Sequence, residues 1–182
     1  MHTPGHATMN LAVVGSCSDP PLTWPILAGA ILPDVPIMLL YVRERLRGTA
    51  EDVIWAQHYQ RRFWQNVIHG LHSIPLAALG LALSLGWGAG QPAAFFASAL
   101  LHACSDLPVH GEDAHRHFLP LSQYRFISPL SYWDARRHGR WVALLEALLV
   151  VLATAVLWRW PLDGWARALL VAVNGWYAQN YW

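Results

Sequence analysis

The strongest constraint in this 182-residue sequence is a run of 43 consecutive residues, 63–105, without a single Asp, Glu, Lys or Arg. Soluble domains need a charged surface and carry about 25% charged residues, whereas this chain has 13%. A helix crosses the hydrocarbon core of a bilayer with about 20 apolar residues. The uncharged run is long enough for two such crossings, so the sequence predicts an integral membrane protein.

The composition excludes several other classes of protein. A chain with 55% hydrophobic residues is neither disordered nor a coiled coil. Its net charge is +1, and its 12 basic residues, all arginines, form no basic stripe, so we expect no nucleic-acid partner. Cys17 and Cys104 give no disulfide framework and no Cys-x-x-Cys metal pair. The first residues lack the basic start of a signal peptide, so we expect no cleaved leader.

Six apolar segments divide the chain, and their length and Leu and Ala content favour helices over barrel strands. They cover about 7–18, 22–42, 64–85, 93–107, 141–158 and 164–181. The second is interrupted by Leu32-Pro33-Asp34-Val35-Pro36, and the sixth is rich in Trp and Tyr, as is typical of membrane interfaces. We expect an all-α integral membrane bundle of about five or six transmembrane helices, with residues 1–182 forming one membrane domain.

Arginine placement predicts the orientation of this bundle. Ten of the twelve arginines lie in the connections 43–62 and 109–140. Two crossings separate these connections, so both lie on the same side, and the positive-inside rule makes that side cytoplasmic. The N-terminus then lies in the cytoplasm as well.

Ionisable side chains recur at one depth below the cytoplasmic face. Each charge within a bilayer costs about 2.5 kcal/mol or more, so such groups need a physical reason. Asp34 lies eight residues before the end of the second segment, and His72 lies eight residues after Trp64 near the start of the third. His102 lies eight residues before His110. A rise of about 1.5 Å per residue places all three about 12 Å deep, and we expect them to line a cleft that faces the cytoplasm.

Two spacings strengthen this expectation. His69 and His72 are three residues apart, and His102 and Asp106 are four apart, so each pair is expected to share a helix face. The predicted metal ligands are His6, Asp34, His69, His72, His102 and Asp106. Imidazole and carboxylate groups suit zinc, and also manganese or iron. Because catalytic zinc needs about three protein ligands, this set leaves room for two metals. The alternative is a polar network that only fixes helix packing.

The segment after the fourth apolar run is polar in a different way. Residues 110–120 contain three His, two acids and one Arg, which can supply a further ligand, a general acid or base, or an anion-binding group. The predicted catalytic residues are His110, Asp113, His115, Arg116 and His117. Arg125 is a second candidate for binding an anionic group. Glu146 adds a carboxylate to the fifth segment, where we expect it to pair with an interfacial arginine.

At these residues the chain resembles the bacterial inner-membrane metal-dependent hydrolase family, the YdjM-like group. That family has a His near the N-terminus, a Leu-Pro-Asp after an apolar run, a paired-His motif ending in His-Ser, and a later His-x-x-x-Asp. The corresponding residues here are Gly5-His6, Leu32-Pro33-Asp34, His69-Gly70-Leu71-His72-Ser73 and His102-Ala103-Cys104-Ser105-Asp106. They occur in the family's order over the first two thirds of the chain. The resemblance implies a multi-pass protein of the bacterial inner membrane that binds a metal.

Two departures from the family pattern concern the ligand set. The family usually has a second acid two residues after the Pro-Asp, where this chain has Pro36, and it spaces its paired His more widely than His69 and His72. The site then holds fewer metals, or the His-rich segment replaces the missing ligand.

The leading functional hypothesis is a membrane-embedded hydrolase that uses a divalent metal, most simply zinc, and acts on an ester, phosphoester or amide of an amphiphilic, lipid-like substrate. The alternative from another class is a non-catalytic metal-binding or transport protein. A transport path needs polar residues in both halves of the bilayer, and the outer half of this chain offers almost none. A third reading is a structural membrane protein whose polar cluster fixes helix packing. The sequence makes no prediction of the oligomeric state.

Overall fold

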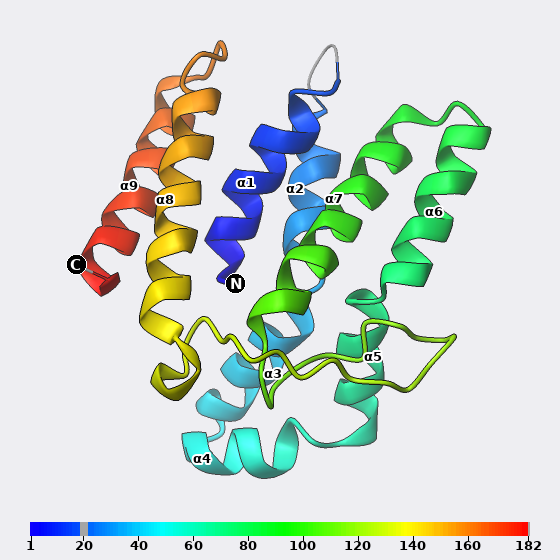
Figure 1. Cartoon of the computed structure of the whole chain (residues 1–182), viewed down its shortest axis with the longest axis vertical. Coiled ribbons are helices and arrows are strands. Elements are labelled where there is room, and N and C mark those ends of the chain that lie inside the picture. Colours follow the sequence, from blue (N-terminus) through cyan, green and yellow to red (C-terminus); the bar gives the residue numbers. More distant parts are fainter. Residues whose placement is uncertain (19–21, 182) are drawn as a thin grey trace.

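The apolar segments fold into helices in the computed structural model, which describes residues 1–18 and 22–181 (Figure 1). Within these residues the chain forms nine α-helices and no β-strand. They are α1 (Thr3–Gly15), α2 (Thr23–Ile31), α3 (Val35–Leu46), α4 (Glu51–Val53), α5 (Arg62–Leu71), α6 (Ile74–Gly86), α7 (Gly90–Asp106), α8 (Gly139–Leu157) and α9 (Gly164–Tyr181). A π-helical turn, Ile54–His58, follows α4, and short 3₁₀ turns occupy Leu107–Val109 and Ala135–Arg137.

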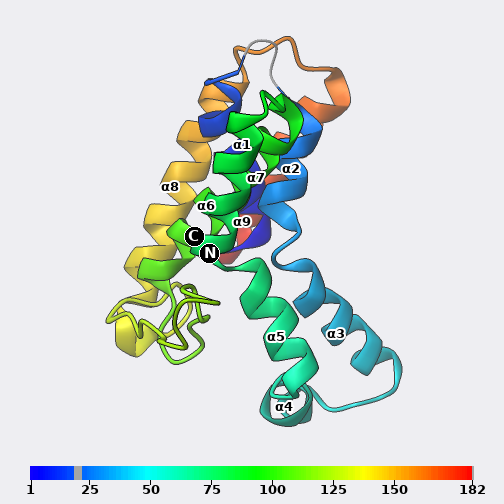
Figure 2. The same ribbon diagram turned by 90° about the vertical axis from the view of Figure 1, so that its right-hand side faces the viewer.

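Six of these helices run side by side as a bundle. Helix α1 packs against α2, α7 and α8, while α9 contacts α8 and α6 contacts α7. Helices α3, α4 and α5, together with the long connection between α7 and α8, lie at one end of this bundle (Figures 1 and 2). The polar segments of the sequence are therefore gathered at a single end.

Two apolar segments are broken and bent where the sequence carries proline. Helix α2 ends at Ile31, and α3 begins at Val35 with an axis 58° away. Pro33 cannot donate a helical hydrogen bond, whereas Pro36 is tolerated in the first turn of α3. This break was predicted.

The second break, between α5 and α6, was not predicted. The single helix expected over 64–85 is two helices bent by 45°, with α5 ending at Leu71 and α6 starting at Ile74. Ser73 caps α6 by accepting a hydrogen bond from the Leu76 N–H, and Pro75 occupies the first turn of α6. Ser-x-Pro at a helix start was the signal for this break in the sequence.

The number of membrane spans is confirmed only in part. By length and composition, α8 is the one helix in the described residues that can cross a bilayer, and the count rises to three if each bent pair is a single span. Helices α1 and α7 have 13 and 17 residues, fewer than the usual crossing of about 20. The expectation of about five or six spans stays a prediction for the remaining helices.

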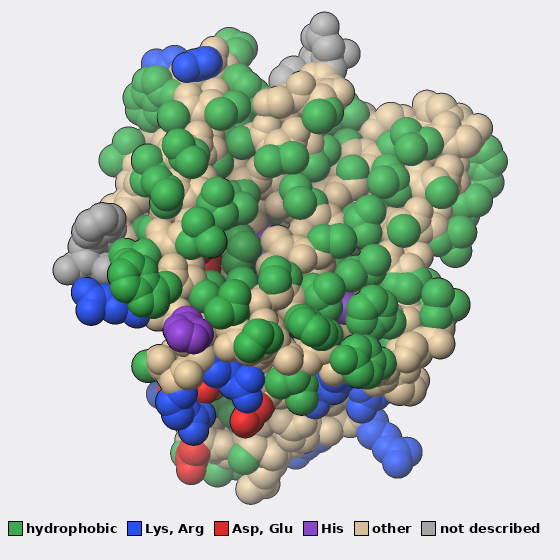
Figure 3. All heavy atoms as spheres, viewed as in Figure 1, with side chains coloured by type: hydrophobic (Ala, Val, Ile, Leu, Met, Phe, Trp, Pro, Cys, Tyr) green, Lys and Arg blue, Asp and Glu red, His purple; other side chains and the backbone are tan. Residues whose placement is uncertain are grey.

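The surface supports a membrane environment for the bundle. In Figure 3 hydrophobic side chains cover the face formed by α8, α1, α7 and α6, and most of the charged groups lie at the end that holds α3–α5 and the connection before α8. Exposed tryptophans occur near both ends of the helices, as in the aromatic belts of membrane proteins. Those near the α1–α2, α6–α7 and α8–α9 connections are Trp24, Trp87, Trp158 and Trp165, and those at the charged end include Trp133 and Trp141.

Candidate metal centre

Helix ends and helix breaks meet at one level of the bundle and bring together the ionisable residues. Asp34 lies at the α2–α3 break and His72 at the α5–α6 break. His102 and Asp106 occupy the last turns of α7, and His6 lies in the first turns of α1. All except Asp34 are buried, and the Asp34 side chain is 14% exposed. The predicted convergence of separate helices on one cluster is present in the fold.

His72, His102 and Asp106 each bring a ligand atom within 4.8 Å of those of the other two, and Asp34 lies close to both histidines; we call these four residues the His72–His102 centre. The Nε2 atoms of the two histidines are 3.3 Å apart. Oδ1 of Asp34 is 3.5 Å from Nε2 of His72 and 3.7 Å from Nε2 of His102. Oδ2 of Asp106 is 3.7 Å from Nε2 of His72 and 3.3 Å from Nε2 of His102. Tetrahedral zinc with bonds of about 2.0–2.2 Å has ligands about 3.3–3.6 Å apart, so these five spacings are close to those that a tetrahedral metal ion needs.

Backbone hydrogen bonds fix how the two histidines are protonated. Nδ1 of His72 lies 2.8 Å from the Ile68 carbonyl oxygen, and Nδ1 of His102 lies 2.8 Å from that of Ala30. A carbonyl oxygen can only accept, so each Nδ1 carries a proton, and in the neutral ring each Nε2 presents a lone pair. Metal-bound histidines are usually held through their other nitrogen in this way. When both rings are neutral and no cation is bound, two lone pairs face each other beside two carboxylates.

Close packing of α2 against α7 places the Ala30 carbonyl beside His102. A Cβ atom added to Gly29 would lie 2.2 Å from the backbone oxygen of Phe95, so only glycine permits this approach. The hydroxyl of Ser98 on α7 donates to the Ile26 carbonyl at 2.6 Å. Asn10 on α1 donates to Ser98 at 3.0 Å, which joins the third helix to the pair.

The two carboxylates have further partners outside the His72–His102 centre. The Thr3 hydroxyl donates to Oδ2 of Asp34 at 2.5 Å. Oδ1 of Asp106 is 2.9 Å from Nε2 of His6 and 2.7 Å from the amino group of Met1. The His6 ring stacks on His102 with 3.7 Å between centroids, so His6 borders the centre and shares a carboxylate with it.

His110 and His115 approach Asp106 from the connection after α7. Nε2 of His110 is 3.4 Å from Oδ1 of Asp106. The His115 ring lies between those of His72 and His110, with centroid distances of 3.9 Å and 5.3 Å. Asp106, His110 and His115 each offer one ligand atom, and these three atoms lie within 4.8 Å of one another.

The other predicted residues of this region lie outside these groups. Nε2 of His69 is 2.9 Å from Oε1 of Gln65. The centroid of the His69 ring lies 5.6 Å from that of His115. His72 follows Leu71 as the C-terminal cap of α5, and the expectation that His69 and His72 share a helix face stays a prediction. The guanidinium of Arg116 donates to Gln123 at 3.0 Å. Their assigned roles stay predictions.

His117 fills the α5–α6 break. Its Nδ1 donates to the His72 carbonyl at 3.1 Å, and its own carbonyl accepts from the Ile74 N–H at 2.8 Å. The neighbouring Ser73 hydroxyl donates to the Leu119 carbonyl. These bonds satisfy the backbone groups that the break frees, so His117 holds the backbone of His72 in place.

The environment shifts the pKa values of the histidines in this connection in different directions. Burial opposes protonation of His110, but the carboxylates of Asp106 and Asp113 outweigh it and raise its pKa to about 9. Burial lowers the pKa of His117 to about 4. Burial likewise lowers the pKa of His115 well below its ordinary value.

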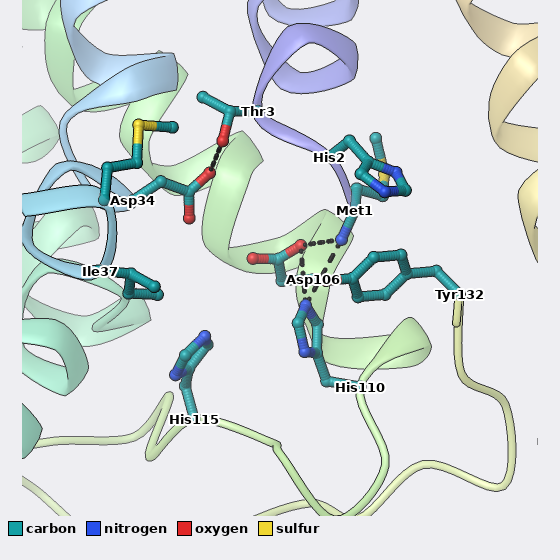
Figure 4. Close-up of a pocket in the computed structure, with 10 residues that line it drawn as sticks. Met1, His2, Thr3, Asp34, Ile37, Asp106, His110, His115 and Tyr132 are labelled. Atoms are coloured by element: carbon teal, nitrogen blue, oxygen red, sulfur yellow. Dashed lines mark hydrogen bonds and ion pairs between the residues drawn. The ribbon is translucent and has the colours of Figure 1, made fainter. Parts of the chain in front are cut away.

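A pocket of about 180 Å³ opens onto the cluster (Figure 4). Asp34, Asp106, His110 and His115 line it, together with the apolar Ile37 and Met38. Figure 4 shows the carboxylates on one side of the pocket and the two imidazoles extending toward them.

Sequence reasoning missed several residues of this pocket, Thr3 and Tyr132 among them. The Tyr132 ring lies 5.1 Å from His110, and burial together with the nearby Asp106 raises its pKa, so the phenol keeps its proton. A single Thr or Tyr has no spacing pattern that would reveal it in a sequence.

Arg125 and Glu146 have roles other than those expected. Arg125 donates to the carbonyls of Ala114 and Glu112, both at 2.7 Å, and so holds the His-rich segment in place. Glu146 was expected to pair with an arginine, which is wrong. Its carboxylate accepts from the Tyr177 hydroxyl at 2.5 Å and from the His2 backbone N–H at 2.8 Å, because α9 packs against this face of α8.

No family model matches this chain, and neither does any curated protein or any solved structure. The resemblance to the YdjM-like family therefore stays a prediction from the motifs. What the structure establishes is an all-α chain with one to three candidate membrane spans and buried His/Asp groups that can bind a metal.

Proposed function

We propose that this chain is a membrane-embedded, metal-dependent hydrolase that acts on an ester, phosphoester or amide of an amphiphilic substrate. The observation that carries the proposal is the His72–His102 centre. Two fixed imidazole lone pairs and two carboxylates, 3.3–3.7 Å apart in the pairs measured, lie beside a pocket. A polar network that only fixed packing would place donors opposite acceptors, whereas the Nε2 atoms of the two neutral rings are acceptors that face each other and two carboxylates.

In this proposal Asp34, His72, His102 and Asp106 hold the cation, zinc being the simplest choice and manganese or iron also compatible. A bound dication supplies Lewis acidity and lowers the pKa of water toward about 7. The pocket residues handle the proton. His115 borders the ligand set and can accept a proton from water, while His110, whose pKa is raised to about 9, and the Tyr132 phenol can donate a proton to the leaving group.

An amphiphilic substrate fits the position of the centre. The pocket lies at the α2–α3 break and the end of α7, and Ile37 and Met38 give it an apolar wall. A second cavity of about 200 Å³, lined mainly by apolar side chains, borders Pro33 and Leu71, the chain neighbours of Asp34 and His72. An acyl chain can occupy this cavity while its polar headgroup reaches the cation.

We further propose that all six apolar segments lie in a bacterial inner membrane, with the N-terminus and both arginine-rich connections in the cytoplasm. The bundle, the exposed leucines of α8 and the tryptophans near both helix ends support this placement. The centre then opens toward the cytoplasm.

Elemental analysis of the purified full chain tests the metal. We expect bound metal in the wild type and its loss, with the fold retained, in the His102→Ala/Asp106→Ala double variant. A matched control replaces an exposed His and an exposed Asp outside the site, His138→Asn/Asp163→Asn, and is expected to keep the metal. Unchanged stoichiometric metal in the first variant would refute the proposed centre.

A hydrolysis screen tests the reaction. Phospholipid and phosphomonoester substrates are offered to the metal-loaded wild type and both double variants. Activity that depends on the metal and on His102 and Asp106 supports the hydrolase. Bound metal without turnover of any substrate supports the non-catalytic alternative, and no metal at all supports a structural cluster.

A further inference from the structure

We propose that the site binds two cations that share Asp106, the second held by Oδ1 of Asp106, His110 and His115. This inference rests on the proposed function because the first cation occupies the His72–His102 centre. It adds two histidines from the connection after α7, outside the motifs that carry the family resemblance.

The two oxygens of Asp106 face different partners. Oδ2 points to the His72–His102 centre, 3.3 Å from Nε2 of His102. Oδ1 lies 3.4 Å from Nε2 of His110 and 2.9 Å from Nε2 of His6. A carboxylate with imidazole nitrogens on both oxygens is placed to bridge two cations, and hydrolytic sites with two metals hold them about 3.5–4 Å apart.

His110 has the supporting partner expected of a metal ligand. Its Nδ1 lies 2.7 Å from Oδ2 of Asp113, and Trp133 donates to the same oxygen at 3.1 Å. Carboxylate–histidine–metal arrangements of this kind fix the ring and direct its other nitrogen at the metal. The free nitrogen here is Nε2, the atom that faces Asp106.

His115 completes the group from the opposite side of the pocket. It is 3% exposed, and a ligand atom of its ring lies within 4.8 Å of those of Asp106 and His110. Its Nδ1 has no hydrogen-bond partner. In Figure 4 the rings of His110 and His115 extend from the connection toward the Asp106 carboxylate.

A positive group already occupies this position. The amino group of Met1 lies 2.7 Å from Oδ1 of Asp106 and 3.4 Å from Nε2 of His110. The position therefore accepts a cation electrostatically, and a metal ion there replaces the ammonium contact. When His110 and His115 both serve as metal ligands, Tyr132 remains as the proton donor of the pocket.

Manganese titration of the metal-free full chain tests the inference. We expect two equivalents of Mn²⁺ per chain, and an electron paramagnetic resonance spectrum of exchange-coupled ions in the doubly loaded protein. His115→Ala and His110→Gln are each expected to lose one equivalent and the coupling, leaving the spectrum of an isolated ion. His138→Asn, which replaces an exposed histidine of the same connection, is expected to keep both equivalents and the coupling.

The outcomes separate the two proposals. One equivalent with an uncoupled spectrum in the wild type overturns the second position and leaves the proposed function intact. No bound Mn²⁺ overturns both. Two equivalents that persist in both His115→Ala and His110→Gln overturn the ligand assignment. The wild-type stoichiometry and coupling decide the question even if one of the variants fails to fold.

Discussion

The Nε2 atoms of His72 and His102 lie 3.3 Å apart, although the two residues are 30 positions apart in the chain and lie on different helices. Each ring uses its Nδ1 proton on a backbone carbonyl of the bundle, Ile68 for one and Ala30 for the other. In the neutral rings both nitrogens that face each other are therefore acceptors. A cation between them converts an unfavourable contact into two bonds, and this relationship leads to the first prediction.

Chelation of the bound metal is expected to lower thermal stability. A metal present at a concentration of 100 times its Kd stabilises the folded state by about 2.7 kcal/mol. In a chain of this size each kcal/mol of stability changes Tm by about 2–4 °C. Addition of EDTA to the detergent-solubilised protein is therefore expected to lower Tm by about 5–11 °C. The His102→Ala/Asp106→Ala variant is expected to show no such shift, and an EDTA-insensitive wild type would contradict a metal at this centre.

Replacement of Gly29 by alanine is expected to force α2 away from α7. The added Cβ would meet the backbone oxygen of Phe95 at 2.2 Å, and overpacking of this kind costs about 1–3 kcal/mol. Because Ala30 supplies the carbonyl that orients His102, the variant is also expected to bind metal more weakly, measured by competition with a chelator.

The matched control for this variant is Gly175→Ala on α9, where an added Cβ would meet nothing within 4 Å. There alanine is expected to leave metal affinity unchanged and to stabilise the helix by about 0.5–1 kcal/mol. Equal effects of the two substitutions would show that the α2–α7 approach has no part in forming the centre.

His117→Ala is expected to weaken metal binding although His117 lies outside the candidate ligand groups. The substitution removes the Nδ1 donor to the His72 carbonyl, and loss of such supporting contacts typically costs about 10–100-fold in metal affinity. His117→Asn, whose amide can donate in the place of Nδ1, is expected to recover part of the affinity. Identical affinities for Ala, Asn and wild type would show that the α5–α6 break is held by other contacts.

The metal-free protein is expected to lose stability on both sides of about pH 6.5. On the acid side, the His117 pKa of about 4 in the folded chain lies below its ordinary value of 6.5. Unfolding therefore takes up a proton between these pH values and is favoured as the pH falls, by up to about 3 kcal/mol. The lowered pKa of His115 acts in the same direction.

On the alkaline side, the raised His110 pKa of about 9 has the opposite sign. Its contribution is fully present below pH 6.5 and is lost as the pH rises through 9. Unfolding midpoints across this range in chelator check both limbs. His117→Asn is expected to flatten the acid limb and His110→Gln the alkaline one, so a profile unchanged in both variants would contradict the assignment.

Tyr177→Phe is expected to destabilise the packing of α9 on α8. The hydroxyl donates to the buried Glu146 carboxylate at 2.5 Å, and hydrogen bonds to charged groups contribute about 1.5–3 kcal/mol. The expected fall in Tm is about 3–12 °C. Tyr124→Phe is the control because Tyr124 is 60% exposed, and an equal change in the two variants would contradict the role of the buried pair.

The sequence by itself determined the helices, the polar end and most of the cluster. An uncharged run of 43 residues can be folded only where its backbone bonds are satisfied internally, which requires helices in an apolar surrounding. The i, i+4 spacing placed His102 and Asp106 on one face, and Pro33 and Pro36 marked the break that exposes Asp34 to the site. These are local properties, fixed by periodicity and by the chemistry of single residues.

Only the tertiary structure decided which of ten histidines face one another. His72, the C-terminal cap of α5, faces His102, whereas His69 lies beside Gln65. The spacing of the two histidines along the chain could not tell these two positions apart. The same holds for His110 and His115, which reach Asp106 through an irregular connection, and for Glu146, whose partner comes from α9. Ligand geometry depends on where separate helices cross and end, and that is set by packing between segments distant in the chain.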